Sequence, residues 1–352
     1  MRVDGVHLAG IGVASTGTVM TAEAVERGWY DAAERDASGM LAVTVAGTTP
    51  APDLAVEAAR TAIATSRHEP AEFCAVFHTN VHPQGPEGWS AQHYINRNTI
   101  DEPVTCVEVR NGCAGFFSLL QLAVCFLAAV PDGSGRTAAL LTGADNFGTP
   151  DVDRWRASNL FLLADGGGAV VLSKRGGFAE LLAVGAASDP ELEERHRSGE
   201  RLFPPGLTVG GRLNFRERTR HYRHRVAEGL ASPGDFGATL VDTVERTLGE
   251  AGVTVADITA VVHDGYGRDA MNVMYLEPLG FGEKDGIWDF TRRTGHAGPV
   301  DQIRGLDRLW RGGRAGPGDT VLMVGDAPGM EAACAVVRVT EPPPPVRPGA
   351  GQ

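Results

Sequence analysis

Cys113 stands in a setting that suits covalent catalysis. It lies in Asn111-Gly112-Cys113-Ala114-Gly115-Phe116, between a segment with strand character (104–109) and a long apolar run (116–130). A strand, a tight turn and an apolar helix in this order place the sulfur at a helix N-terminus, where free N–H groups favour the thiolate. The small neighbours leave room for an acyl group and for a backbone N–H that faces its carbonyl oxygen. The alternative is a structural cysteine, since cysteine is among the most often buried residue types.

Three later positions could complete a site with this sulfur. His263 ends an apolar strand, and the carboxyl ends of strands in open α/β sheets are where site residues collect. His296 and Asp301 lie five residues apart in a glycine-rich turn that enters a helix, so both can face one cavity. The turn 325–330 is rich in small residues and suits close approach of the backbone to a ligand. The alternatives are a hydrogen-bonded loop histidine at 263 and a solvent-facing carboxylate at 301.

The elements that must position these residues alternate along the chain, which favours an α/β fold with a largely buried sheet. Two pairs of apolar segments resemble each other in the same order, 75–78 with 260–263 and 138–145 with 320–327, and indicate two pseudo-twofold halves. We therefore expect an N-terminal half at 1–174, a C-terminal half at 175–340 and a disordered, proline-rich tail at 341–352. The expected strands are 6–13, 75–79, 104–109, 138–143, 168–173, 179–186, 260–263, 320–324 and 332–339, and the expected helices are 53–65, 90–98, 116–130, 235–251 and 269–279.

Composition excludes several classes of function. A net charge of −12 argues against general nucleic-acid binding. We find no leader segment, and the apolar run 116–130 is interrupted by Ser118 and Gln121, so no membrane span is expected. The 5 cysteines have no metal-ligand spacing, which predicts a cytoplasmic protein with reduced thiols and no metal site.

One segment departs from the acidic average. Between residues 195 and 225, nine arginines (195, 197, 201, 212, 216, 218, 220, 223 and 225) stand against Glu200 and Glu217. Such a run is commonly a solvated face. The alternative is a docking surface for an acidic or phosphorylated partner, in which Arg212, Arg216 and Arg220 would take part.

Taken together, these motifs resemble the thiolase-like superfamily, and more closely the β-ketoacyl-acyl-carrier-protein synthase III group with its acyltransferase relatives of secondary metabolism. The resemblance rests on 111–116, on Leu163-Ala164-Asp165-Gly166-Gly167-Gly168-Ala169, on the turn after His263, on Gly295-His296 and on 318–325. It implies a five-layered αβαβα fold, a homodimer and an acyl-thioester intermediate on Cys113. It also implies that His263 is the family histidine and that Arg268 helps to dock an acyl carrier protein.

Two departures from the family pattern guide the functional hypothesis. His296 stands where the condensing enzymes have an asparagine that holds a malonyl thioester, and Asp301 follows it. This set suits transfer to a hydroxyl or thiol, with His263 as the general base and Asp301 orienting it. Pro328, which has no N–H, stands where the family has a glycine that donates to the oxyanion. We therefore expect Gly329 to take that role beside the N–H of Cys113.

These observations predict an acyltransferase in polyketide or related secondary-metabolite biosynthesis. It would take an acyl group from a carrier protein or coenzyme A, pass it to a small-molecule acceptor, and hold no bound cofactor. The family features that grip the adenine of coenzyme A are missing near residues 41–44 and 157, so the thioester of a carrier's phosphopantetheine is the favoured donor. The alternatives are a decarboxylating β-ketoacyl synthase III that forms a C–C bond, and a non-catalytic partner subunit.

Overall fold

Two stacked groups of strands organise the chain in a computed structural model that describes residues 1–204 and 211–344. The first group has the order β5-β4-β6-β7-β1 and the second the order β8-β11-β10-β9. Among the described strands the two groups are joined into one nine-stranded sheet by the pairing of β1 with β8, at His7 with Glu180 and Leu8 with Ala179. The strands are β1 (His7–Val13), β4 (Phe73–Thr79), β5 (Thr105–Val109), β6 (Ala138–Asp145), β7 (Gly166–Ser173), β8 (Ala179–Ser188), β9 (Ile258–Val262), β10 (Thr320–Ala327) and β11 (Glu331–Val339).

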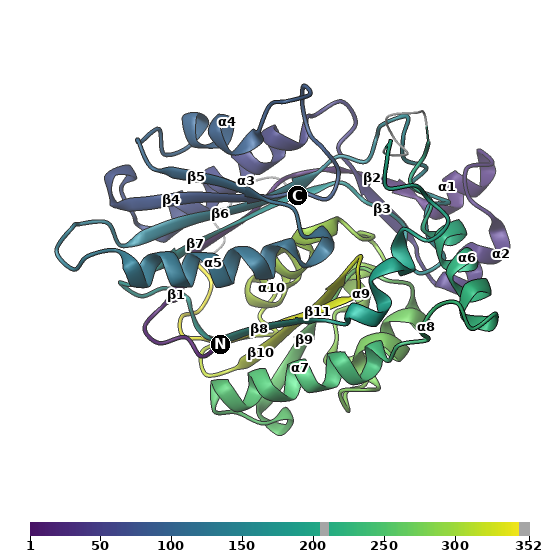
Figure 1. The fold of residues 1–352 in the computed structure, drawn as a ribbon. Coiled ribbons are helices and arrows are strands. Elements are labelled where there is room, and N and C mark those ends of the chain that lie inside the picture. The colour runs from purple at the N-terminus through teal and green to yellow at the C-terminus, as the bar shows by residue number, and fades with distance from the viewer. Residues whose placement is uncertain (205–210, 345–352) are drawn as a thin grey trace.

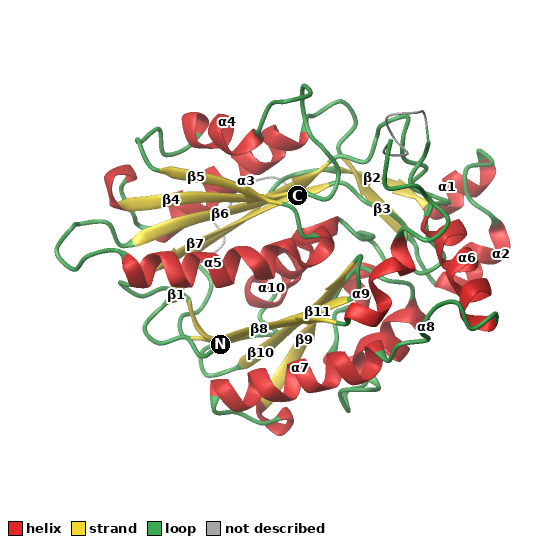
Figure 2. Ribbon diagram, viewed as in Figure 1, coloured by secondary structure: helices red, strands yellow, loops and turns green. Residues whose placement is uncertain are grey.

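Helices cover both groups and also fill the space between them (Figures 1 and 2). Helices α3 (Ala51–Ser66) and α4 (Ala91–Asn98) lie on the outer face of the first group, and α7 (Phe236–Ala251) lies on the outer face of the second. Between the groups lie α5 (Gly115–Ala129) and α10 (Asp301–Arg311). Strands β4, β6, β7 and β10 are buried at every position, which explains their near-continuous apolar sequences. The expected αβαβα fold is confirmed.

The two strand groups repeat one topology. In the first, β4 runs parallel to β6, which is antiparallel to β7, which is antiparallel to β1. In the second, β9 runs parallel to β10, which is antiparallel to β11, which is antiparallel to β8. The sequence pairs 75–78 with 260–263 and 138–145 with 320–327 fall on corresponding strands, which is what a duplication produces. The proposed boundary at residue 174 lies between β7 and β8.

The remaining elements lie around one end of the sheets, where the site residues gather (Figure 1). Helix α6 (Phe215–Ala227) contains the C-terminal part of the basic segment, and its Arg216 makes an ion pair with Glu34 of α2 (Ala32–Ser38). The predicted helix 269–279 is shorter than expected: α8 passes into a π-helical turn, Asn272–Leu276. These elements are α1 (Thr21–Glu26), α2 (Ala32–Ser38), α6 (Phe215–Ala227), α8 (Arg268–Met271), α9 (Trp288–Thr291) and a hairpin of β2 (Gly17–Met20) and β3 (Ala42–Val45).

Helix α5 bears on the expectation that no segment spans a membrane. The stretch Gly112–Ala129 is long and apolar enough to cross a membrane by length and composition, with a mean hydropathy of 1.9. More than half of that stretch is buried inside the fold, between the two strand groups. Burial in the core of the protein therefore explains the apolar sequence of this helix. The expected disorder of the tail 341–352 falls, from residue 345 onward, outside the described residues.

Candidate active site

Cys113 lies at the junction of β5 and α5. It belongs to a 3₁₀ turn, Gly112–Ala114, that leads directly into α5, so its N–H lies in the first turn, where no intrahelical acceptor exists. Gly112 has φ +52°, and a Cβ built there would lie 2.7 Å from Cδ of Pro328. Only glycine therefore lets the β10–β11 turn approach the nucleophile this closely.

His296 contacts the sulfur, and Asp301 contacts the other nitrogen of the His296 ring. His296 Nε2 lies 2.9 Å from Cys113 Sγ, and its Nδ1 lies 2.6 Å from Asp301 Oδ2. The backbone of His296 is fixed by hydrogen bonds with Leu162 and Ala164. The Asp301 carboxylate also accepts hydrogen bonds from the N–H groups of Gly265 and Ala297, at 2.7 and 2.9 Å. The arrangement is a continuous Cys–His–Asp chain, as nucleophilic catalysis requires.

The charges in this chain depend on one another. Burial raises the pKa of the Cys113 thiol to about 11, and His296 offsets part of that rise. Burial alone would lower the pKa of His296, but Cys113 and Asp301 hold it well above its usual range. The pKa of Asp301 is lowered despite its burial, because His296 and Arg304 lie beside it. A thiolate on Cys113 is therefore stable only when His296 carries the proton.

His263 was expected to be the general base, and the structure places it elsewhere. Its Nδ1 lies 2.8 Å from the carbonyl oxygen of Asp264, and its Nε2 accepts a hydrogen bond from the N–H of Ile287 at 3.2 Å. The ring is fully buried, which lowers its pKa to about 4. Asp301, expected to orient His263, instead bonds to His296. The prediction that His263 serves as the base is wrong, because its side chain points into the packing around α9.

Two further carboxyl groups that sequence reasoning missed surround His296. Asp264 accepts a hydrogen bond from Gln302 Nε2 at 2.6 Å, and Asp326 accepts one from the hydroxyl of Tyr266 at 2.8 Å. The hydroxyl of Tyr275 touches both carboxyl groups. Burial raises the pKa of Asp264 to about 7, and burial also raises the pKa of Asp326.

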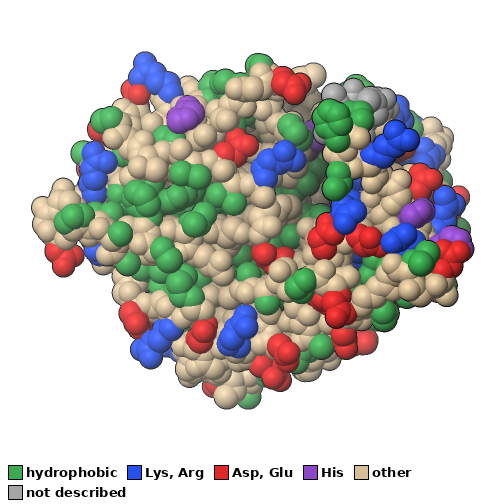
Figure 3. Space-filling model, in the orientation of Figure 1, with side chains coloured by type: hydrophobic (Ala, Val, Ile, Leu, Met, Phe, Trp, Pro, Cys, Tyr) green, Lys and Arg blue, Asp and Glu red, His purple; other side chains and the backbone are tan. Residues whose placement is uncertain are grey.

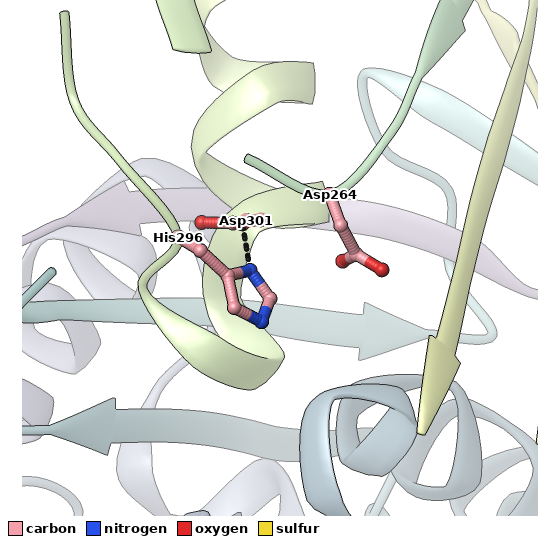
Figure 4. Close-up of side chains that lie close together, drawn as sticks. All are labelled: Asp264, His296 and Asp301. Atoms are coloured by element: carbon pink, nitrogen blue, oxygen red, sulfur yellow. Dashed lines mark hydrogen bonds and ion pairs between the residues drawn. The ribbon is translucent and has the colours of Figure 1, made fainter. Parts of the chain in front are cut away.

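Asp264, His296 and Asp301 have ligand atoms within 4.8 Å of one another, close enough to hold a metal ion (Figure 4). However, His296 uses Nδ1 for Asp301 and Nε2 for Cys113. Neither nitrogen is left for an ion, so this histidine fits an acid–base role better than a ligand role.

The expected oxyanion donor also needs correction. The N–H of Gly329 donates to Nδ1 of His196 at 3.3 Å, so it does not face the sulfur as a free donor. Pro328, which precedes it, has no N–H to offer. The N–H of Cys113 remains as one donor at this position.

A cavity of about 740 Å³ opens onto Cys113, which is 8% exposed. Its wall is largely apolar and aromatic near the sulfur, where the ring of Phe161 lies 5.2 Å from that of Tyr266 and 4.7 Å from that of His296. Towards α6 the wall becomes basic. The lining arginines from the basic segment are Arg195, Arg216, Arg220 and Arg223, and Glu217 lines the cavity among them.

Much of the expected basic docking surface is neutralised. Arg216 makes a bidentate pair with Glu34 at 2.6 and 2.8 Å, and Arg220 lies 3.3 Å from Glu217. Arg268, exposed and outside the cavity lining, pairs with Glu283 at 2.6 Å. Figure 3 shows acidic and basic side chains interspersed over this end of the molecule. Within residues 1–204 and 211–344, no ion pair involves Arg195, Arg201, Arg212 or Arg223.

Both halves of the chain match models of one protein family. Residues 107–190 match the family model for 3-oxoacyl-(acyl-carrier-protein) synthase III, and residues 248–339 match the model for its C-terminal region. No curated protein sequence matches significantly.

Solved structures extend this similarity over nearly the whole chain. The structure of ChlB3, described as an acyltransferase, is 38% identical, covers 96% of this chain and 98% of its own, and has a TM-score of 0.90. The 3-oxoacyl-(acyl-carrier-protein) synthase III of Aquifex aeolicus VF5 is 18% identical over 95% of this chain and 99% of its own, with a TM-score of 0.75. OleA of Xanthomonas campestris is 18% identical over 96% and 98%, with the same TM-score. The last two similarities concern the fold alone.

Proposed function

The chain belongs to the 3-oxoacyl-(acyl-carrier-protein) synthase III family, and from this premise we propose that it transfers an acyl group through Cys113 to a hydroxyl or thiol acceptor. The observation that carries the proposal is the chain of Cys113, His296 and Asp301, with contacts of 2.9 and 2.6 Å. In the first step the Cys113 thiolate attacks the thioester carbon of the donor. The donor's C–S bond then breaks, and the leaving thiolate takes the proton that His296 had held opposite the Cys113 thiolate, which leaves the imidazole neutral.

The charges around His296 favour acyl transfer over decarboxylative condensation. A condensing enzyme must stabilise the enolate that forms when a malonyl thioester loses CO₂, and hydrogen-bond donors serve that purpose. Here Asp264, Asp301 and Asp326 surround the one imidazole, and both of its nitrogens are occupied. An enolate would meet carboxyl groups instead of free donors. The similarity to ChlB3, which is described as an acyltransferase, points the same way.

The basic part of the cavity mouth supports a donor carried on phosphopantetheine. Arg195 and Arg223 line the cavity on the side of α6 and make no ion pair within the described residues, so their guanidinium groups are available to a phosphate on the prosthetic arm. Guanidinium groups recognise phosphate well, and the remainder of the protein is acidic. We place carrier-protein docking at this mouth, in contrast to the paired Arg268.

The outer face of α5 and the edge strand β5 support a homodimer. Among the described residues β5 pairs only with β4, so one side of its backbone lacks partners. On α5, Leu122 is 44% exposed, and Cys125 is exposed beside it. Figure 3 shows hydrophobic side chains gathered over this part of the surface. A second copy of the chain would cover both features.

The test of the proposed function compares donors. The protein is incubated with acetyl and malonyl thioesters of a carrier protein, and its intact mass and the released CO₂ are measured. Acyl transfer predicts a stable adduct that Cys113→Ala abolishes, with no CO₂ from the malonyl donor. Release of CO₂ would indicate the decarboxylating synthase instead, and an inert protein would indicate a non-catalytic subunit.

A further inference from the structure

His196 is a second histidine in the wall of the cavity, outside the Cys–His–Asp chain. It ends the 3₁₀ helix Pro190–His196 and lines the cavity that opens onto Cys113. The N–H of Gly329, in the turn between β10 and β11, donates to its Nδ1 at 3.3 Å. Pro328 of the same turn closely approaches the residue before Cys113. The imidazole is therefore attached to the turn that lies against the nucleophile.

Further contacts hold the ring and the segment that carries it. Glu194, two residues before His196, pairs with Arg225 of α6 at 2.9 Å. The ring of His196 meets the ring of Phe215 edge to face, with a centroid distance of 5.6 Å and an angle of 89° between the ring planes. The imidazole is therefore held in place without a substrate, which lowers the entropic cost of a contact with one.

Hydrogen-bond geometry determines which ring nitrogen of His196 carries the proton. Because a backbone N–H donates to Nδ1, that nitrogen offers its lone pair, and the ring proton lies on Nε2. Burial and the charges of Arg195 and Arg218 lower the pKa of His196 to about 4, so the ring is neutral near pH 7. Among residues 1–204 and 211–344, the Nε2–H donor has no hydrogen-bond partner.

This donor lies at one end of an aromatic stretch of the cavity wall. Beyond Phe215 the wall continues with Phe161, whose ring centroid is 6.0 Å from that of Phe215. The ring of Phe161 in turn lies 4.7 Å from that of His296. A substrate that reaches Cys113 along this wall covers the Nε2–H group of His196. Covering a polar group costs free energy unless the substrate brings a hydrogen-bond acceptor to it.

On the basis of the proposed acyl transfer, we propose that His196 is a specificity-determining residue whose Nε2–H donates a hydrogen bond to an uncharged oxygen of the donor thioester. Such an oxygen has two sources. One is the amide carbonyl of the phosphopantetheine arm, and the other is an oxygen function of the acyl group. The cavity therefore selects thioesters that carry an additional oxygen acceptor over plain alkyl thioesters, because a plain substrate leaves the covered donor without a partner.

A matched set of donors tests this contact. The reference is the S-ethyl thioester of butanoic acid, whose only oxygen belongs to the thioester. The N-acetylcysteamine thioester of butanoic acid adds the amide of the arm, and the S-ethyl thioester of 3-hydroxybutanoic acid adds an oxygen to the acyl group. The formation of acyl-Cys113 is followed by intact mass at low donor concentration. The measured quantity is the ratio of the rate with each oxygenated donor to the rate with the reference.

Three variants separate the Nε2–H donor from the anchoring contact at Nδ1. His196→Asn keeps an acceptor for the N–H of Gly329 but does not reach the position of Nε2, and His196→Phe keeps a ring without an N–H. Both should lower the ratio about fivefold or more for at least one oxygenated donor, as the loss of one hydrogen bond to the substrate predicts. His196→Gln carries an N–H near the position of Nε2 and should retain about half of the wild-type ratio or more. The donor whose advantage disappears identifies the source of the oxygen.

The proposal is overturned if both ratios stay at the wild-type value in His196→Asn and His196→Phe, or if all three donors lose rate equally, since His196 would then only support the turn. Alkylation of Cys113 by iodoacetamide should keep the wild-type rate in these variants, and slower alkylation would also overturn the proposal, because the sulfur itself would be affected. If His196→Phe does not fold, His196→Asn gives the same comparison. Failure of the proposed function looks different: the wild-type protein would then acquire no acyl group on Cys113 from any of the three donors.

Discussion

Replacing His296 with alanine removes the partner on which the reactivity of Cys113 depends. The imidazole is 2.9 Å from the sulfur and is the largest influence that opposes the effect of burial on the thiol. Without it, the sulfur faces buried surroundings and the carboxyl groups of Asp264 and Asp326, both of which disfavour a negative charge. We therefore expect the thiolate to be lost at neutral pH.

The size of the effect follows from the pKa of the thiol. The pKa of about 11 already includes the opposing influence of His296, so without the imidazole the thiol is ionised to less than about one part in 10³ to 10⁴ at pH 7.5. In the wild-type protein the two groups titrate as a pair, and the proton that leaves the sulfur is held on His296, whose pKa Cys113 raises well above its usual range. His296→Ala should therefore slow alkylation of Cys113 by about 10³-fold at this pH, because only the thiolate reacts. Raising the pH should restore the rate by about tenfold per unit.

The assay follows carbamidomethylation of Cys113 by iodoacetamide between pH 6 and 10, using peptide mass spectrometry. The wild-type protein should show a rate that is nearly constant above neutral pH, and His296→Ala a rate that climbs throughout. The matched control is His263→Ala, which removes a buried histidine that does not contact the sulfur and should leave the profile unchanged in the folded protein. A wild-type rate in His296→Ala at pH 7 would refute the reasoning.

Three further predictions concern the surroundings of the site. The double variant Arg195→Glu, Arg223→Glu should lower the rate with a carrier-bound thioester about tenfold or more and spare an N-acetylcysteamine thioester. Arg268→Glu, whose guanidinium already pairs with Glu283, should spare both. Equal losses with both donors would contradict docking at the cavity mouth. Leu122→Lys places a charge on the exposed face of α5 and should convert a dimer into monomers in light scattering, and a monomeric wild-type protein would contradict that interface. Burial lowers the pKa of His78 to about 4, below that of an unfolded histidine. The neutral, buried His78 therefore contributes fully to the free energy of unfolding above pH 6.5, and this contribution is lost as the pH falls towards 4. Urea unfolding between pH 7.5 and 4.5 should therefore show a smaller loss of stability for His78→Gln than for the wild-type protein, and an equal loss would contradict the assignment.

The sequence predicts the fold and the nucleophile because both depend on local patterns. Fully apolar segments and short turns indicate buried parallel strands, and the small residues around Cys113 indicate a crowded turn before a helix. The structure has these features at β4, β6, β10 and α5. The spacing of His296 and Asp301 predicts that both can face one cavity, and the turn that precedes α10 brings the two together. Their direct pairing was not predicted, because Asp301 was expected to orient His263.

The error at His263 has a geometric origin. Successive side chains at the end of a strand point to opposite sides, so a shift of one residue exchanges a packed group for a site group. Periodicity identifies the end of β9 but cannot decide which of His263 and Asp264 points towards Cys113. The useful signal was the pair of aspartates after two neighbouring strands, Asp264 and Asp326, which becomes visible once β9 and β10 are known to be adjacent.

The ion pairs of the basic segment could not be predicted from the sequence. Counting arginines between 195 and 225 shows an excess of positive charge, but the compensating carboxylates come from other parts of the chain. Glu34, for example, is 182 residues away from its partner Arg216. Such long-range pairs depend on the fold, so the sequence alone overstates the free charge on this surface.

The account depends on Cys113 accepting an acyl group and giving it up again. The most direct measurement is the intact mass of the wild-type protein after incubation with an acetyl thioester of a carrier protein, followed by peptide mapping and by a chase with ethylene glycol. The account predicts one acetyl group, located on Cys113, absent in Cys113→Ala and removed by the chase as the acetate ester. An unmodified protein, or an adduct at any other residue, would contradict it.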